Sequence, residues 1–272
     1  MAPVRYSSAP QRRDELLRRL REAGYVSSST AAAELGVSEM TIRRDLGQLA
    51  AEGLARRVVG GASLVDAGTA PPFDLRRGEA TREKDAIARA ALPLLAGAEV
   101  VALDAGTTVA ALARLLPDGL TVITHSLPVL AACTERPDLE VVGLGGTYHR
   151  ATRSFAGPST RAALADLAIG TAVLSATAAG PSGVCSADEW DADTKRAMVA
   201  VADRIVLLLD HRKLAARAPL RVLGLDQADA VVVDDQATDD QLAMLRDHCP
   251  RVVVAGTGDR AAPQPATASA RS

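Results

Sequence analysis

The sequence predicts an α/β protein with two domains: an N-terminal helix-turn-helix with a hairpin, then a larger domain on a mostly parallel sheet. The first observation is a pair of short helical patterns separated by Gly36, which ends a helix without steric cost. The second is a series of short apolar runs beyond residue 82, each separated from the next by a helical stretch. A chain of 272 residues that is 48% hydrophobic has enough apolar content for both cores.

The domain boundaries follow from changes in composition along the chain. We expect a disordered N-terminus over residues 1–10, a DNA-binding domain over 11–65, a Gly-, Pro- and Ala-rich linker over 66–81, an α/β domain over 82–255 and a disordered tail over 256–272. Phe73 and Arg76 are candidates to dock the linker on the second domain.

The first domain is expected to contain three helices and a hairpin. The helical patterns cover residues 11–23, 29–35 and about 39–49, and the hairpin covers 53–65. In the first helix, Leu16, Leu17 and Leu20 face inward, and five arginines are expected on the solvated outer surface, namely Arg12, Arg13, Arg18, Arg19 and Arg21.

The third helix carries the strongest indication of a binding function. Ser38 is placed to cap it, and Ile42, Leu46 and Leu49 share its buried face. A hydroxyl and two guanidiniums on the other face suit phosphates and guanine edges in a major groove, although a charged face is often merely solvated. Hairpin arginines are expected to contact phosphates or to be solvated. The candidate DNA-binding residues are Ser38, Thr41, Arg43, Arg44, Gln48, Arg56 and Arg57.

Charge, cysteine content and hydropathy further limit the classes of protein to which this chain can belong. Residues 1–60 hold ten arginines against seven acidic residues, whereas the remainder of the chain is net acidic, which favours a DNA contact at the N-terminal end. No apolar run is long enough for a membrane span or a secretory signal, so we expect a soluble cytoplasmic protein with no membrane partner. Three scattered cysteines without a CxxC pair predict neither a disulfide framework nor a metal site, and no cofactor is expected.

The second domain is expected to gather polar loops at one edge of its sheet. Strand-like runs lie at residues 99–103, 120–124, 139–144, 172–174, 205–209 and 230–233. Ligands of open parallel sheets bind beyond the carboxyl ends of the strands. Asp104, Gly106, Thr107 and Thr108 follow the first run, and Lys213 follows the fifth. The glycine and hydroxyls suit a phosphate, Lys213 an opposing cation and Asp104 sugar hydroxyls, unless this segment is only a tight turn and cap.

Several segments of the chain resemble the DeoR family of bacterial transcription regulators. In the first domain they are VSEMTIRRDL at 37–46, the Gly53-Leu54 step, Arg56-Arg57 and Gly60-Gly61-Ala62. In the second they are LDAGTT, THS, GGTY, SFAGP, TKRAM and LDHRK, which begin at residues 103, 124, 145, 154, 194 and 209. The resemblance implies a winged helix-turn-helix and an effector-sensing domain similar in fold to ribose-5-phosphate isomerase.

The resemblance also implies a function and a set of pocket residues. The expected protein is a homo-oligomeric, sequence-specific regulator, more commonly a repressor, of carbohydrate genes; its partners are operator double-stranded DNA and a phosphorylated sugar effector. The helix that opens the second domain carries a family lysine, here Lys84. His125 stands where the family usually has Asn, and it is either a donor in an altered pocket or a surface histidine. The candidate effector-binding residues are Asp104, Gly106, Thr107, Thr108, His125, Ser126, Gly145, Gly146, Lys195 and Lys213.

The alternative function is a sugar-phosphate isomerase. Aldose–ketose isomerisation needs a carboxylate that removes a carbon-bound proton. Residues 173–184 contain no Asp or Glu, and Thr194 precedes Lys195 where the similar isomerases carry Glu, so we expect no enzyme activity and no catalytic residues. Asp188, Glu189 and Asp191 lie close enough in the sequence to act as substitutes. A purely architectural DNA-binding protein is disfavoured because it has no use for converging polar loops.

Overall fold

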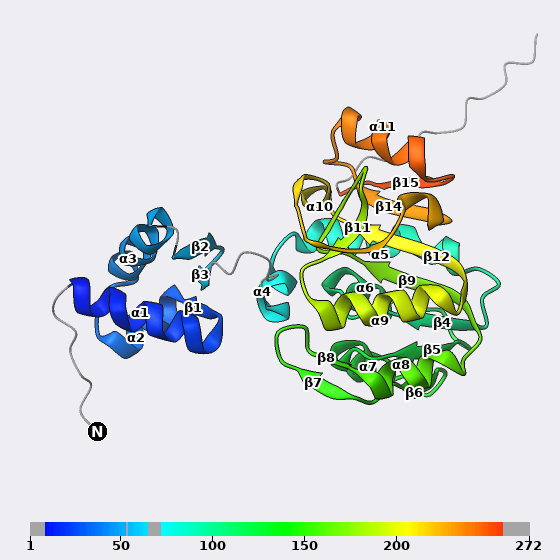
Figure 1. The fold of residues 1–272 in the computed structure, drawn as a ribbon, viewed down its shortest axis with the longest axis horizontal. Helices are drawn as coiled ribbons and strands as arrows, with labels where there is room; N and C mark the ends of the chain where they lie inside the picture. Colours follow the sequence, from blue (N-terminus) through cyan, green and yellow to red (C-terminus); the bar gives the residue numbers. More distant parts are fainter. Residues whose placement is uncertain (1–8, 53, 65–71, 258–272) are drawn as a thin grey trace, which may run out of the picture.

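The computed structural model describes residues 9–52, 54–64 and 72–257 (Figure 1). The disorder predicted for residues 1–8 and 258–272, and the part of the predicted linker at 65–71, lie outside the described residues. Ala9 and Pro10 already belong to a helix, so the prediction of a loose segment up to residue 10 was wrong at its end.

Three helices form the core of the first domain. They are α1 (Ala9–Ala23), α2 (Ser28–Leu35) and α3 (Glu39–Ala51). Leu16 and Leu20 of α1, predicted to face inward, are fully buried and pack with Ile42 and Leu46 of α3, whereas Leu17, also predicted inward, is half-buried. Gly36 ends α2 in the left-handed region at φ 68°, which allows the chain to enter α3 within a few residues. The predicted helix-turn-helix is therefore present.

The hairpin belongs to a three-stranded sheet. Strands β2 (Ala55–Val58) and β3 (Gly61–Leu64) form the predicted antiparallel pair, and β3 also pairs with β1 (Tyr25–Ser27), a strand too short to be recognised in the sequence. The neighbouring strand requires glycine at Gly61, because a Cβ atom there would lie 2.0 Å from the carbonyl oxygen of Val26. This sheet attaches the β2–β3 hairpin, which we call the wing, to the helices.

The outer face of α1 is not uniformly solvated as predicted. Arg12 is 7% exposed, and its Nε donates to Oδ2 of Asp45 on α3 over 2.5 Å. The charge pair joins two helices of the core, so Arg12 has a structural role, and Asp45 lies on the buried face of α3. Arg18 and Arg19 remain at the surface in ion pairs with Glu15 of the same helix.

The second domain is built on a seven-stranded sheet in which every neighbouring pair is parallel (Figure 1). Its order is β15-β14-β12-β9-β4-β5-β6. The strands are β4 (Val100–Leu103), β5 (Thr121–Thr124), β6 (Glu140–Gly143), β9 (Ile169–Ser175), β12 (Ala202–Leu209), β14 (Ala230–Asp234) and β15 (Val252–Ala255). The sequence predicted six of them and missed the last.

Helices cover both faces of this sheet, as the continuous apolar strands require. Along β12, Val206 and Leu208 pack into one core while Leu207 and Leu209 pack into the other, because side chains alternate between faces. The first core includes residues of α5 (Thr81–Ala91), η1 (Leu92–Leu95), α6 (Thr107–Ala113) and α7 (Leu127–Cys133). The second includes residues of α8 (Pro158–Ala165), α9 (Glu189–Ala200), η2 (Leu225–Gln227) and α11 (Asp239–His248).

Short elements decorate the carboxyl edge of the sheet. They are the hairpin of β7 (Thr147–His149) and β8 (Ser154–Ala156), the small sheet of β10 (Ala178–Gly180), β11 (Gly183–Ser186) and β13 (Leu220–Leu223), and the helix α10 (His211–Ala215). No helix within the described ranges is long and apolar enough to cross a membrane.

The predicted linker contains a helix, α4 (Phe73–Gly78). Phe73 is 1% exposed and packs in the first core, with the guanidiniums of Arg76 and Arg153 at 5.9 and 6.0 Å from its ring. Its backbone nitrogen also donates to the carbonyl of Ala151 over 2.7 Å. The docking role predicted for Phe73 and Arg76 is confirmed, but the segment from Phe73 onward is part of the second domain.

Candidate functional site

The N-terminus of α3 is fixed by two of the predicted DNA-binding residues. Ser38 accepts a hydrogen bond from the backbone nitrogen of Thr41 over 3.2 Å, and the two hydroxyl oxygens lie 2.9 Å apart. Ser38 is exposed, whereas Thr41 is half-buried. Both residues therefore cap the helix, and their hydroxyls remain near the surface that the helix presents.

Three predicted polar residues project from α3 into solvent. Arg43 is paired with Glu39 at 2.6 Å, and Gln48 donates to Glu52 over 2.9 Å. Arg44 is exposed and has no ion pair with any residue that the structure describes. Next to it on the helix surface, Met40 is 70% exposed, although the sequence had not marked it as a binding residue.

The wing contributes two exposed arginines. Arg56 and Arg57 follow the buried Ala55 along β2. Arg57 Nη1 donates to the backbone carbonyl of Arg43 over 3.1 Å, so this side chain connects the wing to α3. The structure thus brings Arg43, Arg44 and Arg57 to neighbouring parts of one surface.

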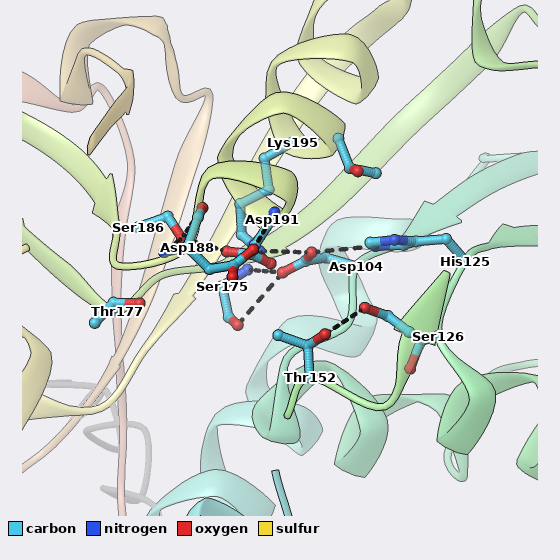
Figure 2. A network of polar contacts seen from close by, with 12 residues as sticks. Asp104, His125, Ser126, Thr152, Ser175, Thr177, Ser186, Asp188, Asp191 and Lys195 are labelled. Atoms are coloured by element: carbon cyan, nitrogen blue, oxygen red, sulfur yellow. Dashed lines mark hydrogen bonds and ion pairs between the residues drawn. The ribbon is translucent and has the colours of Figure 1, made fainter. Parts of the chain in front are cut away.

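At the carboxyl edge of the large sheet, several predicted residues form one buried polar network (Figure 2). Lys195 of α9 donates to Oδ1 of Asp104 over 2.8 Å and to Oδ1 of Asp191 over 2.5 Å. Asp104 Oδ2 accepts the backbone nitrogen of Ser175 over 3.0 Å, and Nε2 of His125 lies 3.5 Å from Asp104 Oδ1. We call Asp104, His125, Ser175, Asp191 and Lys195 the polar network.

The polar network holds its charges in a buried environment. Asp104 is 0% and Lys195 3% exposed. Burial by itself raises the pKa of a carboxyl group, but the charge of Lys195 and the contact with His125 outweigh burial and hold the pKa of Asp104 well below its usual range. Burial lowers the pKa of Lys195, and the two carboxylates more than restore it, so its pKa is raised. Both groups are ionised at neutral pH.

A small cavity of about 20 Å³ adjoins the polar network. Its wall includes Asp188, which caps α9, and Arg76 of α4, which the sequence had placed in the linker. Burial lowers the pKa of Arg76, and the charges of Asp191 and Asp104 oppose that fall. Since 20 Å³ is about the space of one water molecule, a sugar can enter only if neighbouring groups move.

Arg76 also belongs to a second group of side chains, which we call the basic cluster: Arg76, Lys84, Arg212 and Lys213. Arg212 of this cluster contacts two carboxylates: its Nε lies 3.0 Å from Asp210, and its Nη1 lies 3.5 Å from Glu79. Lys84 is 4% exposed and Lys213 is half-buried.

The environment of the basic cluster disfavours the charged forms of its two lysines. Burial lowers the pKa of Lys84 to about 8, and the neighbouring positive charge of Lys213 adds to the fall although Asp210 opposes it. The pKa of Lys213 is also lowered to about 8 by burial, with a further contribution from Arg76. A bound anion stabilises the charged form of lysines in this situation, so the basic cluster is suited to anion binding.

Two of the predicted glycines lie against neighbouring side chains. A Cβ on Gly106 would lie 1.8 Å from Oγ of Ser175, and one on Gly146 would lie 2.3 Å from Oγ1 of Thr160. Both positions therefore require glycine, and Gly106 also lines the cavity beside the polar network. Gly145 is exposed, and its carbonyl accepts from Thr160 over 2.6 Å. Neither Gly145 nor Gly146 lines the cavity beside the polar network.

The remaining predicted residues are buried around the same edge. Ser126 is 0% exposed and caps α7 by accepting from the backbone nitrogen of Val129 over 3.4 Å. Thr107 and Thr108 are 8% and 3% exposed at the start of α6, which is only seven residues long. His125 is 1% exposed, so the alternative of a surface histidine was wrong; its Nδ1 lies 3.0 Å from the carbonyl oxygen of Phe155 and therefore donates to it.

The comparisons with known proteins agree with both domains. Residues 12–67 match the model of the DeoR-like helix-turn-helix domain, and residues 79–235 match that of the DeoR C-terminal sensor domain. A DNA-binding head followed by a ligand-sensing domain defines a transcription regulator. The chain belongs to the DeoR family.

Relatives of known name cover almost the same length. The HTH-type transcriptional repressor CsqR of Escherichia coli is 33% identical over 82% of this chain and 87% of its own. The glycerol-3-phosphate regulon repressor of Escherichia coli is 27% identical over 88% of this chain and 96% of its own. Among solved structures, a D-ribose-5-phosphate isomerase in complex with phospho-erythronic acid aligns with 20% identity and a TM-score of 0.36, covering 48% of this chain and 52% of that chain. That alignment decides neither activity nor ligand.

Proposed function

We propose that this protein is a repressor of carbohydrate-metabolism genes that releases its operator when a phosphorylated sugar binds the second domain. The DNA-binding part of the proposal rests on the family and on the exposed surface of α3. The effector part rests on one observation: four basic side chains gather at the carboxyl edge of the sheet, and two of them are lysines whose pKa values are lowered by burial and by neighbouring cations.

On DNA, α3 is the helix that enters the major groove. Arg44, which has no ion pair with a described residue, is the residue that reads a guanine, and Met40 supplies an apolar contact to a thymine methyl group. Ser38, Thr41, Arg43 and Gln48 position the helix, and Arg56 and Arg57 contact phosphates. Because each operator half-site takes one head, the protein acts as a homo-oligomer, and as a gene regulator it works in the cytoplasm.

In the second domain, each of the two groups of side chains binds a different part of the effector. The basic cluster holds the phosphate, so Lys84 and Arg76 join Lys213 among the binding residues. Asp104, Asp191 and His125 of the polar network exchange hydrogen bonds with sugar hydroxyls, while Ser126, Thr107 and Thr108 support the surrounding loops. Glycerol 3-phosphate, which one relative's name mentions, is the simplest compound with both chemical features.

The polar network does not favour the alternative of an isomerase. Asp188 and Asp191 line the cavity and Asp104 contacts Lys195 beside it, so acidic groups are present at this site. A general base needs a pKa near the working pH, whereas Lys195 keeps Asp104 firmly ionised. We therefore expect no turnover of ribose 5-phosphate, and product formation that Asp188→Ala abolishes would overturn this part of the proposal.

The proposal is tested by titrating the full chain with glycerol 3-phosphate and other sugar phosphates. Thermal shift finds the ligand, and fluorescence anisotropy with the DNA upstream of the gene measures operator release. Lys84→Met and Lys213→Met are expected to bind DNA normally and to need at least tenfold more ligand for release. Arg89→Met, an exposed charge change on the same helix as Lys84, serves as the control. If both lysine variants respond like the control, the basic cluster does not bind the effector.

A further inference from the structure

Helix α4 contacts Lys84, one of the residues to which we assign the phosphate. The ammonium group of Lys84 donates to the backbone carbonyl of Glu79 over 2.7 Å and to that of Arg76. These carbonyls lie at the C-terminal end of α4, where unsatisfied carbonyls attract a cation. These two bonds leave one of the three ammonium donors for a phosphate, so a phosphate that takes two donors of Lys84 must displace a carbonyl.

Other contacts also hold α4 on the second domain. Phe73 anchors it in the core, and Asp74 pairs with Arg153 at 2.9 Å beside the β7–β8 hairpin. Glu79, just after the helix, lies 3.5 Å from Arg212 of the basic cluster. Three of the four basic-cluster residues are thus either part of α4 or in contact with its C-terminal end: Arg76, Lys84 and Arg212.

The junction between α4 and α5 is a place where the helix can turn. Ala80 has φ 47°, in the left-handed region that alanine rarely adopts. Its carbonyl accepts the backbone nitrogen of Lys84 over 3.0 Å and so begins α5. A conformation that costs energy at one residue between two helices is relieved when one of them moves.

We infer that α4 is an internal competitor of the effector: its C-terminal carbonyls occupy Lys84 in the free protein, and the phosphate of the effector displaces them and undocks the helix. This inference rests on the proposed function. Because α4 directly follows the linker to the DNA-binding domain in the sequence, its displacement carries the signal from the sensor site to the heads. The effector shifts the equilibrium only as far as it prefers the undocked state.

The inference predicts that weaker docking of α4 strengthens ligand binding. When a competing contact must open before a ligand binds, the apparent dissociation constant falls in proportion to the open fraction. Asp74→Ser removes one exposed ion pair and is expected to tighten binding of glycerol 3-phosphate about two- to fivefold. Phe73→Ala removes the core anchor and is expected to tighten binding at least tenfold. Asp118→Ser, which breaks the comparable exposed pair with Arg136, is the matched control and leaves the affinity unchanged.

The experiment combines calorimetric titration of these full-length variants with hydrogen exchange of the peptide 73–80. Saturating glycerol 3-phosphate is expected to raise the exchange rate of this peptide at least fivefold in the unaltered chain, and Lys84→Met is expected to raise it without ligand. Because Phe73→Ala can impair folding, Asp74→Ser decides if that variant is unstable. Binding without faster exchange, or equal affinities in Asp74→Ser and Asp118→Ser, overturns the inference but leaves the proposed function intact. If no variant binds any sugar phosphate, both are wrong.

Discussion

The stability of the polar network depends on a single lysine, and its removal gives a quantitative test. Lys195 lies between Asp104 and Asp191 with its Nζ at 2.8 and 2.5 Å, and its side chain is 4% exposed. Lys195→Met keeps much of the volume of the side chain but leaves two carboxylates without their cation. Breaking a buried ion pair from one side costs about 3–5 kcal/mol, so we expect the free energy of unfolding to fall by that amount at pH 7.

The loss of stability in Lys195→Met is expected to depend on pH, because the variant changes the pKa of Asp104. In the unaltered chain the pKa of Asp104 is already below its unfolded value, so its contribution is present at pH 7 and at pH 5 and is lost only in stronger acid. Without Lys195, burial raises the pKa of Asp104 above the unfolded value, and protonation then stabilises the variant as the pH falls. The difference between the two proteins is therefore expected to be smaller at pH 5 than at pH 7.

Urea unfolding followed by tryptophan fluorescence measures this effect directly, because the only tryptophan, Trp190, begins the helix that carries Lys195. Adding Asp104→Asn to Lys195→Met is expected to restore about half of the loss, since an amide is not charged. Arg161→Met, which breaks an exposed pair with Asp193 of the helix that carries Lys195, is the control and costs about 0–1 kcal/mol. A loss below 1 kcal/mol for Lys195→Met at pH 7, or an equal loss at pH 5, would refute the reasoning.

Three further predictions concern DNA and ligand binding. Arg44→Ala is expected to cost about 1–3 kcal/mol in specific operator binding and little in non-specific binding, measured by anisotropy with competitor DNA; equal losses on both DNAs would remove its reading role. Arg57→Ala is expected to weaken binding to all sequences alike and to lower the slope of log affinity against log salt by about 1; an unchanged slope would mean no phosphate contact. Above pH 8, Lys84 and Lys213 lose their protons, so sugar-phosphate affinity is expected to fall up to tenfold per pH unit for each lysine. Over the same pH range the free protein is expected to gain stability, because the lysines of the unfolded chain keep their protons to higher pH. Calorimetry from pH 7 to 9.5 checks this, and a constant affinity would exclude a role for these ammonium groups.

The gathering of Asp104 and His125 at one edge was predictable from the sequence because both follow parallel strands, whose carboxyl ends meet. The position of Asp191 was not predicted, since it depends on a helix that approaches from the side. The contact between Gly106 and Ser175 of the neighbouring strand was not predicted for a related reason, since only the folded sheet brings them together. Strand order brings such residues together, and local pattern does not encode it.

Local pattern also failed where charged residues are buried. Arg12 was placed on a solvated face because arginine is usually exposed, and its partner Asp45 was hidden by a sequence separation of 33 residues. The sequence did not predict helix α4, because its six residues, which follow two prolines, are too few to show a helical periodicity. Lys84 was noticed as a family feature, but its contact with α4 required the position of that helix.

Phe73 is the one aromatic side chain among the fully buried apolar residues of the described chain, in a protein that is 2% aromatic. A shortened sensor that starts at residue 82, where composition alone places the boundary, would lack this ring and leave a hole in its interior. For truncations and for chimaeras with foreign DNA-binding heads, the joint therefore belongs upstream of Pro72. Fragments cut there are expected to be well folded, and fragments cut at residue 82 to aggregate.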